Sequence, residues 1–202
     1  MNINFDKPWL KNYPEGVSSN INFDEYSSLV DMFEKTCNRF SSNKAFTNFG
    51  VSFTFKEIYQ KSTNLASFFQ NELNLSQGSR VAIMMPNILQ YPISTFGILK
   101  AGLIVENINP LYTARELETQ LINSKSETII ILENFANLIE KIIHKTVVKN
   151  IIITSAGELL GIKGFLINFV LRKIKKMVPE YKIDKFYTFS KIIENNDKYE
   201  IK

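Results

Sequence analysis

A chain of 202 residues with 45% hydrophobic and 22% charged side chains can bury an ordinary core, which excludes a wholly disordered protein. The formal net charge of +4 is small, and its excess lies between Arg172 and Lys176 without an aromatic-interleaved basic face, so nucleic-acid binding is not expected. The single cysteine, Cys37, excludes an internal disulfide, and no charged segment followed by an apolar core opens the sequence. We therefore expect a cytoplasmic protein.

The first 26 residues show neither a helical nor a strand period, and we expect an extended arm anchored by Trp9. From Ser28 onward, apolar residues recur at helical spacing to Phe40, which predicts an amphipathic helix capped by Ser28. Cys37 lies on the apolar stripe of this helix. This position favours a small buried core residue over a nucleophile.

Two short aromatic-rich runs, 45–49 and 51–53, surround Asn48 and Gly50 and predict a hairpin with a tight turn. Thr54 and Glu57 have the spacing of a capping box, which predicts a helix that continues to about Leu73.

Beyond Arg80, apolar strands are predicted at 81–85, 103–105, 128–132 and 150–154. They alternate with predicted helices at about 89–100, after a second capping box at Thr113 and Glu116, and at 135–144. The predicted fold class is α/β: a mostly parallel sheet flanked by helices and preceded by an extended arm, a helix and a hairpin. We expect an arm at 1–26, a partial α/β domain at 27–155, and a basic amphipathic helix with a polar tail of the same domain at 156–202.

The stretch from Leu159 to Leu171 is too short and too interrupted for a membrane span. As a helix, the segment up to Met177 places its apolar side chains on one side and most of its lysines away from them. Two interpretations stay open: an interfacial helix on anionic lipid, or a core helix with a solvated face. After Pro179 the chain is polar, and no closing element is expected. The side chains that would contact a membrane are Ile162, Leu166, Phe169, Lys173, Lys175 and Lys176.

ATP-dependent chemistry needs a phosphate-binding loop and magnesium ligands. The segment nearest to such a loop runs from Gly157 to Gly164. It does not have the spacing G-x-x-x-x-G-K-[ST], so its glycines are interpreted as turn and helix punctuation. The only histidine, His144, is expected at the surface. The residues alone therefore assign no catalytic, cofactor-binding or metal-ligating position. The glycine-containing segment comprises Gly157, Gly161, Lys163 and Gly164, and the carboxylates expected on polar helix faces or in capping boxes are Asp31, Glu34, Glu57, Glu116 and Glu118.

Five stretches can be compared with a known family: KPWLKNYPEGV, DEYSSLVDMFE, FTFKEI, RVAIMMPNILQYPISTFGILKAGLIVENINPLYTARELE and GFLINFVLRKIKKMVPEYKI. Through these stretches the chain resembles the N-terminal part of bacterial long-chain fatty acid–CoA ligases, which belong to the adenylate-forming, AMP-binding superfamily. The resemblance implies that ATP and a fatty acid form an acyl adenylate and pyrophosphate, and that CoA then displaces AMP. Magnesium is expected as a cofactor.

In the resembled family, the phosphate loop, the magnesium contacts and the C-terminal domain with its catalytic lysine lie beyond the matched region. No position here inherits a catalytic role, and the chain alone is expected to be inactive. Three partners are expected. One is a separately encoded C-terminal part that would complete a split ligase, and one, implied by the resemblance, is a second copy bound through the arm around Trp9. The third, expected from the amphipathic segment, is the inner face of a membrane.

Two residues depart from the sequence pattern of that ligase family. Glu106 stands where an apolar residue of a buried strand is expected, and a lone buried carboxylate would be costly. Ala114 replaces a helix-opening proline. An alternative function is a non-catalytic peripheral membrane or partner-binding module. A different nucleotide-binding α/β protein is disfavoured, because Met85, Pro86 and Asn87 after the first parallel strand provide no glycine for phosphate approach.

Overall fold

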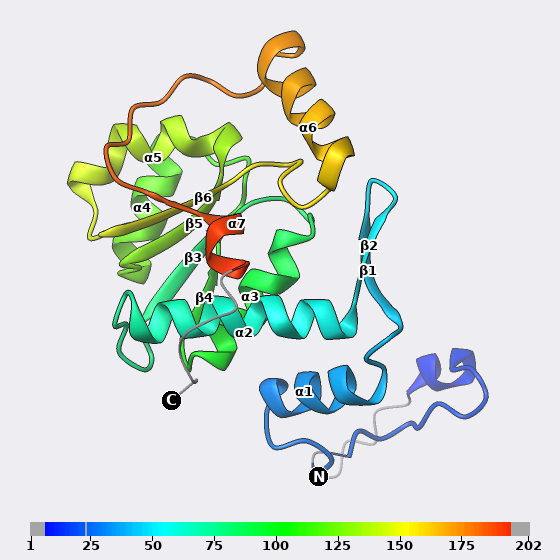
Figure 1. Cartoon of the computed structure of the whole chain (residues 1–202). Helices are drawn as coiled ribbons and strands as arrows, with labels where there is room; N and C mark the ends of the chain where they lie inside the picture. Colours follow the sequence, from blue (N-terminus) through cyan, green and yellow to red (C-terminus); the bar gives the residue numbers. More distant parts are fainter. Residues whose placement is uncertain (1–6, 23, 195–202) are drawn as a thin grey trace.

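The computed structural model describes residues 7–22 and 24–194. Its centre is a five-stranded sheet with the order β4-β3-β5-β6-β7, in which every neighbouring pair is parallel (Figure 1). The predicted mostly parallel sheet is therefore confirmed. The strands are β3 (Arg80–Met84), β4 (Ile104–Asn107), β5 (Thr128–Leu132), β6 (Asn150–Thr154) and β7 (Tyr187–Thr188).

Helices cover both faces of this sheet and enclose two hydrophobic clusters. One face packs on α2 (Phe55–Asn71), α3 (Gln90–Lys100) and α7 (Phe189–Ile193), and α1 (Leu29–Arg39) packs in turn on α2 and α3. The other packs on α4 (Ala114–Ser124) and α5 (Ala136–Ile142). Side chains of β5 alternate between the clusters, and all five of its residues are buried. A buried central strand with β-branched residues is what a parallel sheet with two covered faces requires.

The hairpin consists of β1 (Lys44–Asn48) and β2 (Val51–Thr54), paired antiparallel with Asn48 opposite Val51. Phe49 and Gly50 form its two-residue turn, with φ of 47° and 76°. Two positive φ angles match the twist of the flanking strands, and this confirms the expected tight turn.

Side-chain caps fix the helix starts that the sequence predicts. Ser28 accepts a hydrogen bond from the Asp31 amide at 3.0 Å. Complete capping boxes form at Thr54 with Glu57 and at Thr113 with Glu116, in which each threonine amide donates to the glutamate side chain. Ala114 opens α4 without a proline, and the Thr113 cap accepts a hydrogen bond from the Glu116 amide of the first turn.

Three expectations are wrong. Trp9, in the short 3₁₀ turn η1 (Pro8–Asn12), is 51% exposed and does not anchor the arm, of which residues 1–6 and 23 lie outside the described residues. Glu106 is half-buried on the edge strand β4 and accepts a hydrogen bond from the Gln120 side chain, so it is not a lone buried carboxylate. The segment after Pro179 does supply a closing element: β7 pairs with β6, and Phe189 of α7 is fully buried.

The basic amphipathic segment forms α6 (Gly161–Phe169), which continues into the π-helical turn η4 (Val170–Ile174). Its apolar side chains are largely exposed, including Ile162 at 94% and Phe165 at 80%. The stripe does not pack into the core of the described residues, and the choice between the two interpretations stays a prediction. The structure describes no helix with the length and hydropathy needed to cross a membrane. The remaining helical turns are η2 (Glu133–Phe135) and η3 (Ile143–Lys145).

Candidate functional site at the carboxyl edge of the sheet

The strand order defines where a ligand site is expected. From β3 the chain continues to β4 on one side of it and then crosses to β5 on the other side. Open α/β sheets bind ligands outside the carboxyl ends of the strands at such a switch point. The segments at this edge are 85–89, 108–110, 133–135 and 155–160, which follow β3, β4, β5 and β6.

A hydrogen-bonded polar cluster lies at the carboxyl end of β6. The Gln90 side chain is 1% exposed and donates to Thr154 Oγ1 at 3.0 Å and to the Ser155 carbonyl at 2.8 Å. Glu158 accepts from the Thr154 hydroxyl, from the Ser155 amide and from the Ser190 amide at 3.1 Å. Since three donors already engage the Glu158 carboxylate, it serves to join β6 to the start of α7.

Two glycines bring α6 against this edge. A Cβ atom at Gly157 would overlap the carbonyl oxygen of Gly164, and one at Gly164 would overlap the carbonyl of Gly157. Asn168 adds two hydrogen bonds of 2.8 Å each, accepting from the Gly157 amide and donating to Ser155 Oγ. Gly157 and Gly164 are thus explained by the close approach of a loop and a helix, and Gly164 lies inside α6 and does not mark one of its ends.

An ion pair holds the far end of the same segment. Arg172 donates from Nε and Nη2 to the Glu133 carboxylate at 2.6–3.1 Å, and the Glu133 side chain is 4% exposed. The hydrogen bonds to Glu133 raise the pKa of the Arg172 guanidinium. Beside it, Asn134 Nδ2 donates to the Met177 carbonyl at 2.9 Å. The sequence alone did not identify Glu133, because it lies 39 residues from its partner.

Two cavities open near the carboxyl edge. One, of about 440 Å³, lies between the hairpin and α3 and is mainly apolar, with Phe46, Ile88, Tyr91 and Phe96 among its lining residues. A smaller one, of about 360 Å³, lies between the segments that follow β3 and β4. The first has the size of a small-molecule pocket but few polar groups to orient a ligand.

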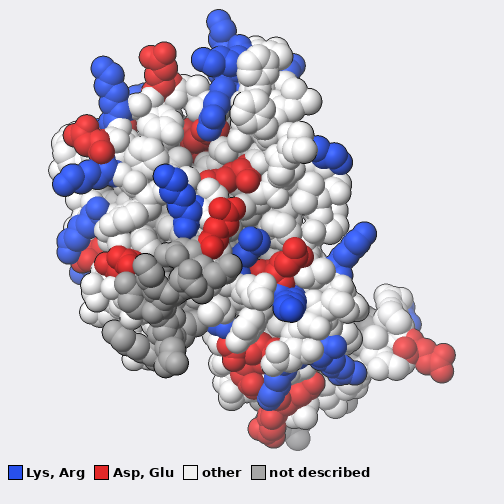
Figure 2. All heavy atoms as spheres, viewed as in Figure 1, with Lys and Arg blue, Asp and Glu red and all other residues white. Residues whose placement is uncertain are grey.

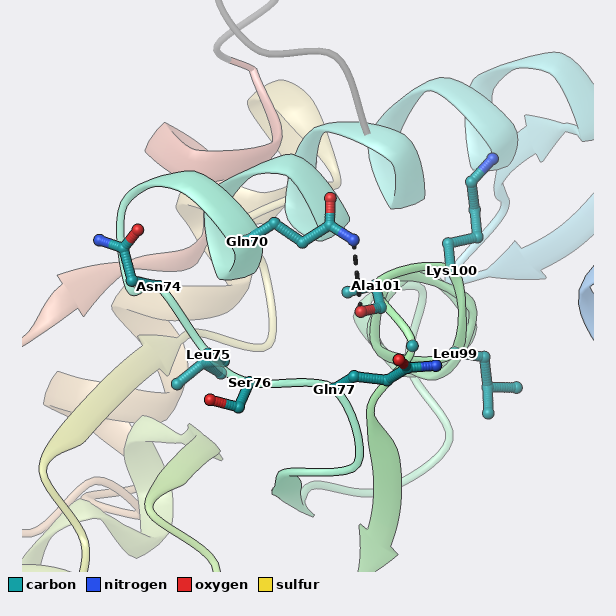
Figure 3. A pocket seen from close by; sticks show the side chains of 9 residues that line it. Gln70, Asn74, Leu75, Ser76, Gln77, Leu99, Lys100 and Ala101 are labelled. Atoms are coloured by element: carbon teal, nitrogen blue, oxygen red, sulfur yellow. Dashed lines mark hydrogen bonds between the residues drawn. The ribbon is translucent and has the colours of Figure 1, made fainter. Parts of the chain in front are cut away.

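A larger cavity, of about 580 Å³, lies at the opposite, amino edge of the sheet (Figure 3). Gln70 donates to the Ala101 carbonyl there at 3.3 Å. Lys100 points away from this cavity, because its ammonium group pairs with Glu34 at 2.8 Å and lies 3.8 Å from the Tyr59 ring centroid. Size alone therefore does not identify the functional site, since no charged group is directed into this cavity from the described residues that line it.

The structure gives the exposure and the partners of the residues that the sequence singled out. Cys37 is 3% exposed and His144 is exposed, as expected. Residues 7–22 and 24–194 contain no group of three His, Cys, Asp or Glu side chains placed to hold a metal ion. The carboxylates likewise have partners within the fold: Asp31 pairs with Lys35, Glu34 with Lys100 and Glu118 with Lys145, while Glu57 and Glu116 complete the capping boxes.

The described residues also do not fit a magnesium–triphosphate group. Glu133 and Glu158 are engaged by internal donors, and the turn after β3 reads Met85, Pro86, Asn87 without a glycine. No step through ATP is therefore derived from these side chains. The absence of catalytic and ligand-binding positions from this chain stays a prediction.

Comparison with known proteins decides the family. The family model described as "AMP-binding enzyme" matches residues 33–167. This chain belongs to the AMP-binding enzymes. Within this family, it is 47% identical to a long-chain-fatty-acid–CoA ligase of Escherichia coli O157:H7 over 94% of its length and 34% of the relative. It is 33% identical to a ligase of the same description from Bacillus subtilis, over 91% of this chain and 32% of that relative.

Solved structures support the fold. An anthranilate CoA ligase in complex with anthranoyl-AMP superposes with a TM-score of 0.66 at 19% identity, over 84% of this chain and 28% of that one. A long-chain-fatty-acid-CoA ligase from Archaeoglobus fulgidus gives 0.56 at 23% identity, over 62% and 27%. This AMP-binding chain thus spans about a third of the length of the relatives it matches.

Proposed function

We propose that this chain forms the N-terminal scaffold of an ATP-dependent long-chain fatty acid–CoA ligase, which converts fatty acid, ATP and CoA into acyl-CoA, AMP and pyrophosphate through an acyl adenylate. The observation that carries the proposal is 47% identity over 94% of the chain to a relative described as such a ligase. In this proposal magnesium and ATP are held by the parts of the enzyme that lie outside the matched third, and this third by itself is inactive.

A chimera tests the scaffold. The first third of the Escherichia coli relative is replaced by this chain, and fatty-acid-dependent pyrophosphate release is measured with ATP and CoA. The expected result is turnover by the chimera and none by either part alone. Mixing the two parts as separate polypeptides tests association. A folded but inactive chimera would contradict the assignment, and turnover by residues 1–202 alone would contradict the inactivity of the chain.

We propose as a second function that α6 and η4 bind an anionic membrane surface from the cytoplasmic side. The supporting observation is an exposed apolar stripe beside exposed cations. Such a combination is typical of interfacial helices. The stripe comprises Ile162, Phe165, Leu166, Phe169, Ile174 and Met177, and the cations are Lys163, Lys173, Lys175 and Lys176.

Sedimentation with vesicles of mixed neutral and anionic phospholipid tests this surface. Reversal of Lys173, Lys175 and Lys176 to Glu is expected to abolish salt-sensitive binding. A matched control reverses Lys56, Lys125 and Lys191, which are exposed on other elements. Equal loss in both triple variants would show a net-charge effect and contradict a localised surface.

A homodimer through the arm is a further part of the proposal. Residues 7–22 carry exposed apolar side chains, among them Trp9 at 51% and Ile21 at 78%. In Figure 1 this segment projects from the body of the molecule. Light scattering on the full chain is expected to give a dimer that Trp9→Ala with Ile21→Ser converts to a monomer, and an unchanged mass would contradict this interface.

A further inference from the structure

The hairpin tip breaks the usual rule for its turn. Residues with positive φ in a two-residue hairpin turn are ordinarily Asn, Asp or Gly, because a larger side chain crowds the backbone there. Phe49 nevertheless adopts φ of 47°, and its side chain is 64% exposed. The fold thus accepts a strained backbone position and an exposed aromatic ring at the same residue. Asn, Asp or Gly would fit this turn with less strain, which is a reason to look for a use of the exposed ring.

The hairpin tip lies beside the first turn of α6. The Lys163 ammonium group is 3.7 Å from the position that a Cβ atom on Gly50 would occupy. Figure 1 shows the hairpin extending toward the beginning of α6. Phe49 follows the last residue of β1 and precedes Gly50, and Ile162 precedes Lys163 in α6. Two exposed apolar residues from distant parts of the chain, Phe49 and Ile162, are thus each next in sequence to a residue of the contact between Gly50 and Lys163.

Charge favours a lipid occupant over a protein one. Figure 2 shows basic side chains at the end of the molecule where Figure 1 places α6, next to surface without charge. Lys163, Lys173, Lys175 and Lys176 are exposed around the apolar stripe. Lysine is depleted from the cores of protein interfaces but attracted to anionic headgroups, and its long side chain can keep the ammonium group in water while the carbons contact lipid.

We propose that Phe49 inserts into the same anionic bilayer as the apolar face of α6, so that the lipid-binding surface consists of the hairpin tip and the helix together. This inference rests on the proposed membrane function of α6. Burial of the Phe49 ring in the bilayer is expected to raise membrane affinity about tenfold, which is the effect of burying one aromatic side chain.

Phe49→Asn separates lipid binding from folding. Asn-Gly is the preferred sequence for this turn, so the variant is expected to keep or improve the stability of the hairpin while vesicle binding falls about tenfold. Val147→Asn is the control, because Val147 is 47% exposed in the connection before β6, at the opposite edge of the sheet. The control is expected to bind vesicles as the unchanged chain does.

Depth of insertion is measured with a tryptophan probe placed at the hairpin tip. In a Trp9→Phe background, Phe49→Trp is expected to show a blue shift and quenching by brominated acyl chains on anionic vesicles, and Val147→Trp neither. If Phe165→Ser weakens vesicle binding but the Phe49→Trp probe stays unquenched and Phe49→Asn binds normally, the helix surface stands and the hairpin inference is overturned. If the unchanged chain binds no vesicles, both fail. Shielding of the same probe by self-association without lipid also overturns the inference.

Discussion

The contact between Gly97 of α3 and Leu65 of α2 gives a prediction whose sign depends on two opposing effects. Alanine has a helix propensity about 1 kcal/mol better than glycine, which would stabilise α3. A Cβ at Gly97 would, however, lie 2.9 Å from Leu65 Cδ2, 3.0 Å from its Cβ and 3.1 Å from its Cγ. Leu65 is fully buried, and a rotamer change cannot move its Cβ. The helices would have to separate, at a cost of about 1–3 kcal/mol.

We therefore expect Gly97→Ala to lower the free energy of unfolding by about 1 kcal/mol, the overpacking cost minus the propensity gain. Urea unfolding followed by far-UV circular dichroism measures it. Asn123→Ala, at an exposed position of α4, is the control and should be neutral or slightly stabilising. Leu65→Ala alone should cost about 2–5 kcal/mol, and adding Gly97→Ala should then cost less than in the unchanged chain. A stabilised Gly97→Ala, or strict additivity, would refute the reasoning.

Three further predictions concern single groups. Burial raises the pKa of the Cys37 thiol to about 11, so at about pH 8 we expect slow labelling by a thiol reagent in the folded chain and rapid labelling in urea; rapid labelling without urea would contradict its burial. The Thr54 amide lowers the pKa of Glu57, so the Glu57 carboxylate stabilises the fold above its ordinary pKa of about 4.3, and this stabilisation is lost as pH falls through the lowered value. In urea unfolding at a series of acid pH values, the free energy of unfolding of Glu57→Gln should therefore fall less steeply with falling pH. Glu133→Gln should speed amide hydrogen exchange in residues 170–177 while β5 stays protected, and unchanged exchange would show that the ion pair does not hold η4.

Local signals in the sequence predicted most of the fold correctly. Ser28 and the capping boxes at Thr54 and Thr113 fix helix starts through bonds only three residues long. The apolar strand runs, such as 128–132, identify strands that are buried on both faces. These elements could be predicted because the interactions that define them lie within one turn or one strand.

Most features that the sequence analysis did not predict depend on partners outside the element itself. Tyr187 and Thr188 form a strand of two residues paired with Ile152 and Ile153, and so short a strand shows no alternating pattern in the sequence. The strand expected at 103–105 begins at Ile104, because the Leu103 amide instead donates to the Ile98 carbonyl at the end of α3. Glu106 avoids the expected penalty through the Gln120 side chain. Pairs such as Glu133 with Arg172 leave no periodic pattern, so single-residue reasoning could not assemble the carboxyl-edge cluster.

The exposed face of α6 is fixed by contacts on its inner side. An amphipathic helix that could rotate freely would turn its apolar stripe toward the core, because burial of Ile162 and Phe165 is favourable. Such a rotation would separate Gly164 from Gly157 and break both hydrogen bonds of Asn168. Arg172 and Met177 are also held, by Glu133 and Asn134. The polar anchors thus select the orientation in which the apolar residues face away from the core of the described residues.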